Sequence, residues 1–199
     1  MTLPVDSLDM WEATAGLPEQ MAAALAAAGT VDDLTAAALA ADGPITNVVA
    51  CGMGGSGIAG DVLAAVAAPD LAVPVSVAKS YDLPAFVGPD SLVFAVSCSG
   101  DTEETLAAAT AAGRAGATVV AVTAGGRLGA LAVAEGWPVF DVPADIPQPR
   151  AALGAMAVPP LVVLERLGLL DGVSARLAAT ADALSRRRDQ LVRPGSVAE

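Results

Sequence analysis

Short apolar runs that alternate with alanine-rich stretches constrain the fold of this chain more than any other feature of its sequence. Five such runs occur, at residues 45–51, 73–77, 91–96, 117–122 and 137–142. The intervening stretches favour helices at residues 58–68, 102–116 and 127–135. Strands without strict polar alternation, joined through helices, are typical of a parallel sheet buried on both faces. We therefore expect an α/β domain with a doubly wound, five-stranded parallel sheet in the flavodoxin-type strand order.

Composition supports this fold class. The chain is 54% hydrophobic but only 3% aromatic, so its core must consist largely of Ala, Val and Leu. Because Ala favours helices and Val favours strands, alternating helices and strands suit this composition better than an all-β sandwich does.

Further alanine-rich patterns flank the predicted sheet and predict extra helices at both ends of the chain. They lie at residues 8–28 and 31–41 before the sheet, and at residues 151–169 and 174–191 after it. We expect Pro159 and Pro160 to disturb the helix that contains them, because proline removes a backbone donor. The predicted organisation is a pair of amino-terminal helices at 1–43, an α/β domain at 44–150, and a helical extension and linker at 151–199.

Charge and cysteine usage exclude several classes of function. The net charge is −12 and histidine is absent, so neither nucleic acid nor an anionic membrane is an expected partner. Cys51 and Cys98 are too few and too isolated for a disulfide framework or a metal site. The amino terminus has no basic, apolar leader pattern, and prolines interrupt the longest apolar run. We expect a cytoplasmic protein without a bound metal.

The stretch at residues 97–105 (SCSGDTEET) carries the strongest functional signal. It joins a predicted strand to a predicted helix, where unpaired N–H groups and the helix dipole favour an anion. Ser97, Ser99 and Thr102 add hydroxyl donors, and Gly100 allows close approach of the backbone. The pattern predicts a cradle for the phosphate group of a phosphorylated sugar.

Helix capping is the alternative explanation of the same stretch. Asp101, three residues before Glu104, resembles a capping box, and acidic residues favour a first helical turn without any ligand. Capping accounts for the acidic residues, but it does not require Ser97 and Ser99.

A second motif, GMGGSG at residues 52–57, matches the dinucleotide fingerprint G-x-G-x-x-G and follows a predicted strand. A nicotinamide or flavin site would need an acidic residue at the end of the next strand, and residues 77–80 contain none. A tight strand–helix turn explains the glycines equally well, but it does not explain Ser56. Loops after the first and third strands lie side by side in such a sheet, so Ser56 and the 97–102 loop are expected to meet. The backbone at Gly54, Gly55, Gly57 and Gly100 would then line the site.

Three motifs in this order, at residues 51–61 (CGMGGSGIAGD), 97–105 and 148–154 (QPRAALG), resemble the sugar isomerase (SIS) domain family. The resemblance is closest to the bifunctional phosphoglucose/phosphomannose isomerases. It implies isomerisation of glucose 6-phosphate and mannose 6-phosphate to fructose 6-phosphate through an enediolate, without metal or redox cofactor. The resemblance assigns the phosphate to Ser56, Ser97, Ser99 and Thr102. It assigns Arg150 to the enediolate, where a fixed guanidinium would stabilise developing charge.

The sequence departs from the family pattern in two ways. The family has an aromatic residue in place of Cys98 and asparagine in place of Asp101. It also has a second SIS domain that supplies a glutamate base, a histidine and a lysine, whereas this chain resembles the amino-terminal half and has no histidine. We therefore expect a homodimer or packing against a second SIS domain. The alternative is a non-catalytic, regulatory sugar-phosphate-binding module, and a less favoured one is an NAD(P)-binding Rossmann domain.

Overall fold

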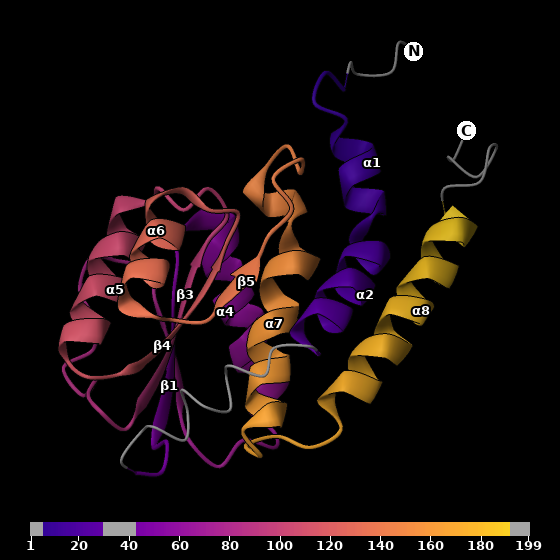
Figure 1. Ribbon diagram of the computed structural model, residues 1–199. Coiled ribbons are helices and arrows are strands. Elements are labelled where there is room, and N and C mark those ends of the chain that lie inside the picture. Colours follow the sequence, from indigo (N-terminus) through magenta and orange to yellow (C-terminus); the bar gives the residue numbers. More distant parts are fainter. Residues whose placement is uncertain (1–5, 30–42, 192–199) are drawn as a thin grey trace.

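A five-stranded parallel sheet forms the centre of the computed structural model, which describes residues 6–29 and 43–191 (Figure 1). Its strands are β1 (Asn47–Cys51), β2 (Val75–Ala78), β3 (Ser91–Ser97), β4 (Thr118–Thr123) and β5 (Val139–Asp141). They lie in the order β2-β1-β3-β4-β5, and every neighbouring pair is parallel. This order confirms the predicted doubly wound topology. The strands are added to one side of β1 first and then to the other, so the order of strands reverses between β1 and β3. The carboxyl ends of these two strands are adjacent, with Cys51 paired to Ala95.

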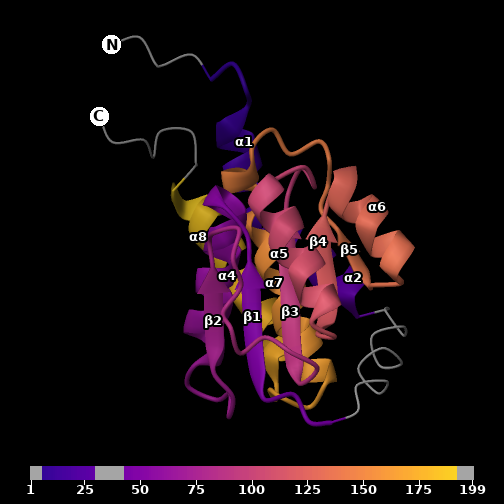
Figure 2. The ribbon, with the colours of Figure 1, turned by 90° about the vertical axis from the view of Figure 1, so that its left-hand side faces the viewer.

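Helices cover both faces of the sheet (Figure 2). Helices α4 (Gly54–Ala67) and α7 (Leu153–Arg166) cover one face, and α5 (Glu103–Arg114) and α6 (Gly126–Glu135) cover the other. Alternate strand residues therefore enter different cores: Val48 and Phe94 pack towards α4 and α7, whereas Val49 and Ala95 pack towards α5. All four side chains are fully buried. Burial of both faces explains why these strands have no polar alternation.

The prediction that Pro159 and Pro160 disturb their helix, α7, is wrong. The helix is continuous from Leu153 to Arg166 with Pro159 and Pro160 inside it, and the short 3₁₀ turn η1 (Pro149–Ala151) precedes it. Residues 154–164 are all buried between the sheet and the outer helices. The apolar area buried by such a helix stabilises it enough to offset the missing proline donors.

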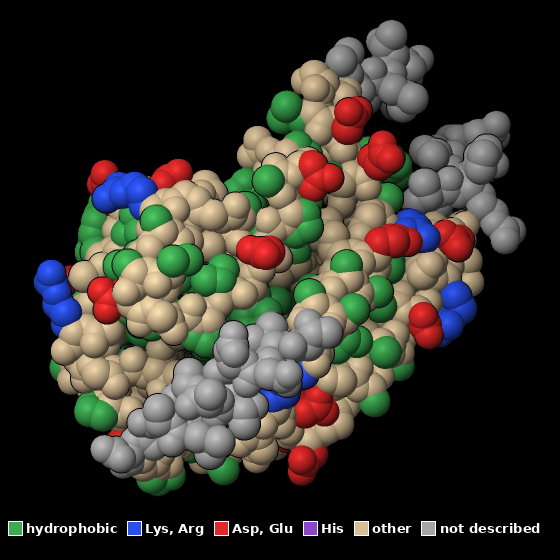
Figure 3. Space-filling model, in the orientation of Figure 1, with side chains coloured by type: hydrophobic (Ala, Val, Ile, Leu, Met, Phe, Trp, Pro, Cys, Tyr) green, Lys and Arg blue, Asp and Glu red, His purple; other side chains and the backbone are tan. Residues whose placement is uncertain are grey.

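A third layer of helices packs on the outside of α7 and η1 (Figure 1), and acidic and basic side chains lie close together on its surface (Figure 3). It consists of α1 (Met10–Ala15), α2 (Leu17–Ala28) and α8 (Val173–Leu191). The single helix expected at residues 8–28 is interrupted at Gly16, and the helix expected at residues 31–41 lies outside the described residues. Arg188 fixes α8 to this layer by donating to the Glu19 carboxylate at 2.7 and 2.8 Å and to the Ala15 carbonyl at 3.0 Å.

Within residues 6–29 and 43–191, no helix combines the length and the hydropathy needed to cross a membrane.

Candidate functional site

The first turn of α4 and the 97–102 loop, which are far apart in the sequence, meet at the carboxyl ends of β1 and β3. The backbone N–H of Cys98 donates a hydrogen bond to the Ser56 hydroxyl oxygen at 3.2 Å. The Ser56 hydroxyl in turn donates to the sulfur of Met156 on α7 at 3.4 Å. Ser56 is only 6% exposed. The structure therefore brings Ser56 to the 97–102 loop, as the predicted topology requires, and fixes its hydroxyl between that loop and α7.

The Ser97 hydroxyl organises the loop from inside. It is fully buried, donates to Thr102 Oγ1 at 3.0 Å, and accepts from the Gly100 N–H at 3.1 Å. Because Thr102 Oγ1 already accepts from Ser97, its own proton is available to a further acceptor. Ser99 is exposed, and its hydroxyl accepts from the Asp101 N–H at 3.2 Å. Of these three hydroxyl groups, those of Ser99 and Thr102 are the ones that a ligand can reach.

Helix α5 presents its amino terminus at the same place. Its N-cap residue is Thr102, whose own side chain makes no capping hydrogen bond. The first N–H that reaches a preceding carbonyl is that of Leu106, which donates to the Thr102 carbonyl at 3.0 Å. The Thr105 hydroxyl is buried, and no described residue is hydrogen-bonded to it. Uncapped N–H groups and the positive end of the dipole make this terminus suitable for an anion.

The capping box proposed for Asp101 and Glu104 is wrong. Asp101 accepts a hydrogen bond from the Arg127 N–H, at the start of α6, at 3.0 Å. It therefore serves the neighbouring helix and not α5. A sequence pattern of spacing three cannot reveal this, because the partner lies 26 residues away.

The turn that the sequence predicts at residues 52–57 is shorter in the structure: Gly52 and Met53 precede the helix, and residues 54–57 already belong to it. Helix α4 starts at Gly54, which has φ 52°, so Gly55 and Gly57 belong to its first turn. A Cβ on Gly55 would lie 2.8 Å from the Arg150 backbone nitrogen, and one on Gly57 would lie 2.7 Å from the Gly52 carbonyl oxygen. Glycine is therefore needed at position 55 for the close approach of η1 to α4, and at position 57 because the helix starts so close to the Gly52 carbonyl.

Arg150 lies on η1, directly beside the start of α4. Its side chain is exposed, and among the residues that the structure describes none is hydrogen-bonded or ion-paired with its guanidinium. A guanidinium in this position adds positive charge at the carboxyl edge of a protein whose net charge is −12. Its planar fork of donors suits an oxyanion.

Two other side chains near this edge, those of Lys79 and Cys98, have no expected part in binding an anion. Lys79, immediately after β2, forms an ion pair with Asp61 of α4 at 2.6 Å. A lysine engaged in this way is not the acidic residue that a dinucleotide ribose requires at this strand end. Burial raises the pKa of the Cys98 thiol, so Cys98 is an apolar neighbour of the loop hydroxyls and not a thiolate.

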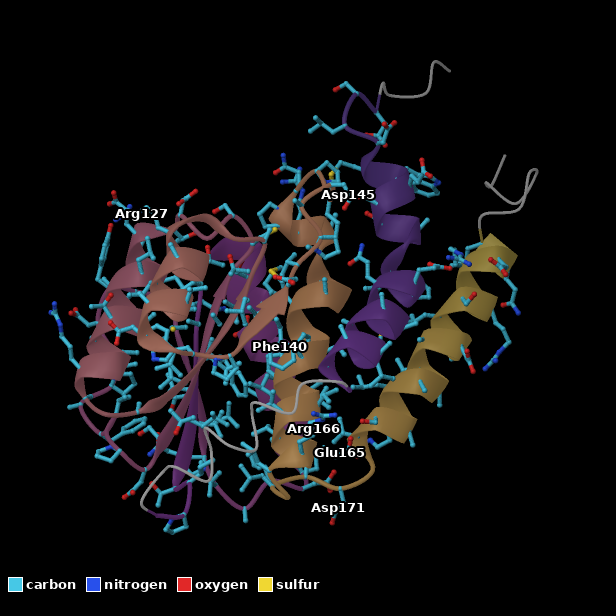
Figure 4. The ribbon with its side chains drawn as sticks, viewed as in Figure 1. Arg127, Phe140, Asp145, Glu165, Arg166 and Asp171 are labelled. Atoms are coloured by element: carbon cyan, nitrogen blue, oxygen red, sulfur yellow. The ribbon has the colours of Figure 1, made fainter. Side chains whose placement is uncertain are left out.

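The acidic residues Glu135 and Glu165 are distant from this edge. Glu135 is the last residue of α6. Glu165 lies at the far end of α7, as Figure 4 shows, and accepts hydrogen bonds from the N–H (3.0 Å) and the hydroxyl of Ser174 at the start of α8. The described part of the chain also holds no group of three His, Cys, Asp or Glu residues that could bind a metal ion.

Sequence reasoning missed three residues that shape the site. They are Thr105, Met156 and Thr123. The Thr123 hydroxyl donates to the Gly125 carbonyl at 3.1 Å and accepts from the Gly125 N–H at 3.2 Å. Thr123 ends β4 as Ser97 ends β3, and the registers pair these two residues. A hydroxyl residue at the end of two successive strands was the signal that could have identified it.

Comparison with known proteins identifies relatives of this chain. No protein-family model matches the sequence. Over 133 residues the chain is 38% identical to a bifunctional phosphoglucose/phosphomannose isomerase from Caldicellulosiruptor bescii, which covers 67% of this chain and 39% of that protein. This chain is a homologue of the bifunctional isomerases and has the SIS fold. The match spans less than half the length of the relative.

Solved structures share the fold of this SIS domain. Tagatose-6-phosphate ketose/aldose isomerase from Escherichia coli superimposes with a TM-score of 0.71 at 16% identity, covering 96% of this chain and 57% of that chain. The NanR protein of Vibrio vulnificus, solved in complex with ManNAc-6P, has a TM-score of 0.56 at 20% identity, covering 86% of this chain and 68% of that chain. At these identities the likeness concerns the fold alone.

Proposed function

We propose that the edge formed by the ends of β1 and β3 binds the phosphate group of a hexose 6-phosphate. The observation that carries this proposal is the hydrogen bond from the Cys98 N–H to Ser56, because it joins the first turn of α4 to the hydroxyl-bearing 97–102 loop beside the start of α5. Ser99 and Thr102 would donate to phosphate oxygens, together with the first N–H groups of α5. Ser56 and Ser97 would hold the loop in the shape that allows this.

With a second SIS domain, the bound sugar would undergo aldose–ketose isomerisation. Glucose 6-phosphate or mannose 6-phosphate would lose a proton from C2, give an enediolate and regain a proton at C1, yielding fructose 6-phosphate. Arg150 would stabilise the negative oxygen of the enediolate. The base must reach the carbon-bound proton, and since Glu135 and Glu165 lie elsewhere, we assign it to the second domain. The homology to isomerases supports this reaction class.

A phosphosugar sensor is the second candidate. It is favoured by the absence of histidine from this chain and by the likeness in fold to NanR, which was solved with a sugar phosphate. In this case the same loops would bind the ligand without turning it over.

Partner and location follow from the same proposal. An open groove between α1, α2 and α8 is lined by apolar side chains that include Trp11, Leu184 and Leu191, and Trp11 is 65% exposed. We propose that a second SIS domain, or a second copy of this chain, packs against this layer, and that the protein acts on phosphorylated sugars in the cytoplasm. Light scattering tests this packing. A stable monomer, at high concentration of the chain and with a second SIS domain added, would contradict the proposed packing.

Calorimetric titration with fructose 6-phosphate tests the binding site. Ser99→Ala and Thr102→Val should each weaken binding about tenfold, since a charge-assisted hydrogen bond contributes about 1.5–3 kcal/mol. Ser80→Ala is the matched control, because Ser80 is exposed and its hydroxyl donates to the Asp82 carbonyl and not to the 97–102 loop. Equal affinity for fructose 6-phosphate in all three variants would refute the assignment of Ser99 and Thr102 to the phosphate group.

A coupled isomerase assay separates the two functions. The chain alone and the chain supplied with a second SIS domain are compared at saturating glucose 6-phosphate. Turnover by the second preparation supports the isomerase. Binding without turnover in either preparation supports the sensor.

A further inference from the structure

Asp101 links the two loops at the edge of the site. Its carboxylate accepts from the Arg127 N–H in the first turn of α6 at 3.0 Å. Helix α6 follows Gly125, which has no side chain with which to cap the helix. Asp101 therefore supplies, from a different loop, the cap that the sequence around α6 lacks.

Backbone hydrogen bonds join the same two loops on either side of Asp101. The Ala124 N–H donates to the Cys98 carbonyl at 3.0 Å, and the Leu128 N–H donates to the Gly100 carbonyl at 2.8 Å. Together with Asp101, they tie residues 98–101 to residues 124–128. We call this set of three hydrogen bonds the loop clamp.

The loops approach so closely that glycine is required on both sides of the clamp. A Cβ on Gly100 would lie 1.9 Å from the Gly125 carbonyl oxygen, and one on Gly126 would lie 2.4 Å from the Ser99 carbonyl oxygen. Any shift of the 124–128 loop must therefore move Ser99 as well. Ser99 and Thr102 flank Asp101 and carry the reachable hydroxyls, so their positions depend on the clamp.

The charge of Asp101 also has a structural explanation. A carboxylate in a phosphate-binding loop would repel the ligand if it lay at the amino terminus of α5. Its bond to Arg127 instead places one oxygen at the amino terminus of α6, where the helix dipole stabilises negative charge. The acceptor oxygen makes this bond, and an amide oxygen of the same shape would make it too.

We propose that Asp101 is a positioning residue for the phosphate loop: by capping α6 it holds Ser99 and Thr102 in place without touching the ligand. This inference rests on the proposed function, because it assigns Asp101 a task within that same site. This positioning role requires an acceptor oxygen on the side chain of residue 101 and does not require a negative charge there.

Three variants and two measurements test the proposal. Hydrogen exchange of the Arg127 amide reports the clamp directly, and calorimetry with fructose 6-phosphate reports its effect on the site. Asp101→Ala should speed exchange at Arg127 about fivefold, the change expected when a helix loses its cap, and weaken binding about threefold to tenfold. Asp101→Asn should restore slow exchange and bind at least as tightly as the unmodified chain, since it keeps the acceptor and removes a negative charge.

Glu165→Ala is the matched control. Glu165 caps α8 as Asp101 caps α6, but at the far end of the molecule. Its removal should lower stability to a similar extent and leave the affinity for fructose 6-phosphate unchanged. Should Asp101→Ala not fold, Asp101→Ser replaces it, with an acceptor too short to reach Arg127 and the same expected losses.

Several results would overturn the proposal. They are unchanged exchange at Arg127 in Asp101→Ala, binding by Asp101→Asn as weak as that of Asp101→Ala, or an equal loss of affinity in Glu165→Ala. Failure of the unmodified chain to bind fructose 6-phosphate would instead refute the proposed function. Exchange at Arg127 would still decide whether Asp101 forms the clamp.

Discussion

The Cys98 backbone nitrogen and the Ser56 hydroxyl oxygen lie 3.2 Å apart and form the hydrogen bond that joins the end of β3 to the start of α4. The two residues are 42 positions apart in the chain. Their contact depends on β1 and β3 being neighbours in the sheet. It makes Ser56 a structural element of the site, which holds the 97–102 loop in place.

We expect Ser56→Ala to destabilise the fold by about 1–2 kcal/mol, because the Cys98 N–H then loses its acceptor. Ser80→Ala, at an exposed hydroxyl, should change stability by less than about 0.5 kcal/mol. Guanidinium chloride unfolding of both variants measures the difference. Equal midpoints for the two would show that the Ser56–Cys98 bond contributes nothing.

Gly100→Ala should be far more damaging than the matched change Gly136→Ala. Both glycines have positive φ, 76° at Gly100 and 70° at Gly136, so alanine is strained at either position by about 1–2 kcal/mol. A Cβ at Gly136 meets no atom within 4 Å, whereas one at Gly100 would lie 1.9 Å from the Gly125 carbonyl oxygen. The expected losses are about 1 kcal/mol for Gly136→Ala and about 3 kcal/mol or more for Gly100→Ala.

Thermal unfolding of the two glycine variants provides the measurement. Comparable shifts in Tm would mean that the 97–101 and 124–128 loops separate easily to admit a methyl group. That result would also weaken the loop clamp.

Alkaline pH should destabilise the protein through Cys51. Burial raises the pKa of this thiol from 9.0 to about 12. Above pH 9 the unfolded chain therefore ionises at Cys51 while the folded chain does not, and stability falls as pH rises through this window. At pH 10.5 the loss from this one group is about 2 kcal/mol.

Cys51→Ala removes that titration, so its unfolding free energy should fall less steeply than that of the unmodified chain between pH 9 and pH 11. Alkylation gives an independent check: in the folded protein Cys98, which is half-buried, should react with iodoacetamide, and Cys51 should not. Parallel pH profiles for the two proteins would disprove the effect.

Arg150→Lys should separate activity from stability. The guanidinium is exposed and has no partner among the described residues, so unfolding should change by less than about 0.5 kcal/mol. In the presence of a second SIS domain, kcat for isomerisation should fall about 100-fold, because an ammonium cannot reproduce the planar fork of donors. Unchanged kcat would remove Arg150 from the proposed mechanism.

Several features of the fold could be predicted because they depend on local pattern. The five strands were located within a few residues, since uninterrupted apolar runs such as Leu92–Val96 bury both faces of a parallel strand. The strand order followed from chain direction and crossover hand. The meeting of Ser56 with the 97–102 loop followed from that order.

Other features had no local signal. The sequence could not distinguish the buried Ser97, which shapes the loop, from the exposed Ser99, two residues later on the same loop. It misassigned Asp101 to α5, and it overestimated the effect of Pro159 and Pro160 on α7. In each case the outcome depends on which distant segment packs against the residue.

The sequence by itself determined the fold class, the strand order and the edge at which the site forms, because periodicity and chain direction are local properties that a short window contains. The tertiary structure alone decided which hydroxyls a ligand can reach, which helix Asp101 caps and why α7 tolerates two prolines. These depend on contacts such as Asp101 with Arg127 and Ser56 with Cys98. The free energy of such contacts comes from burial and hydrogen bonding between segments that the packed chain brings together.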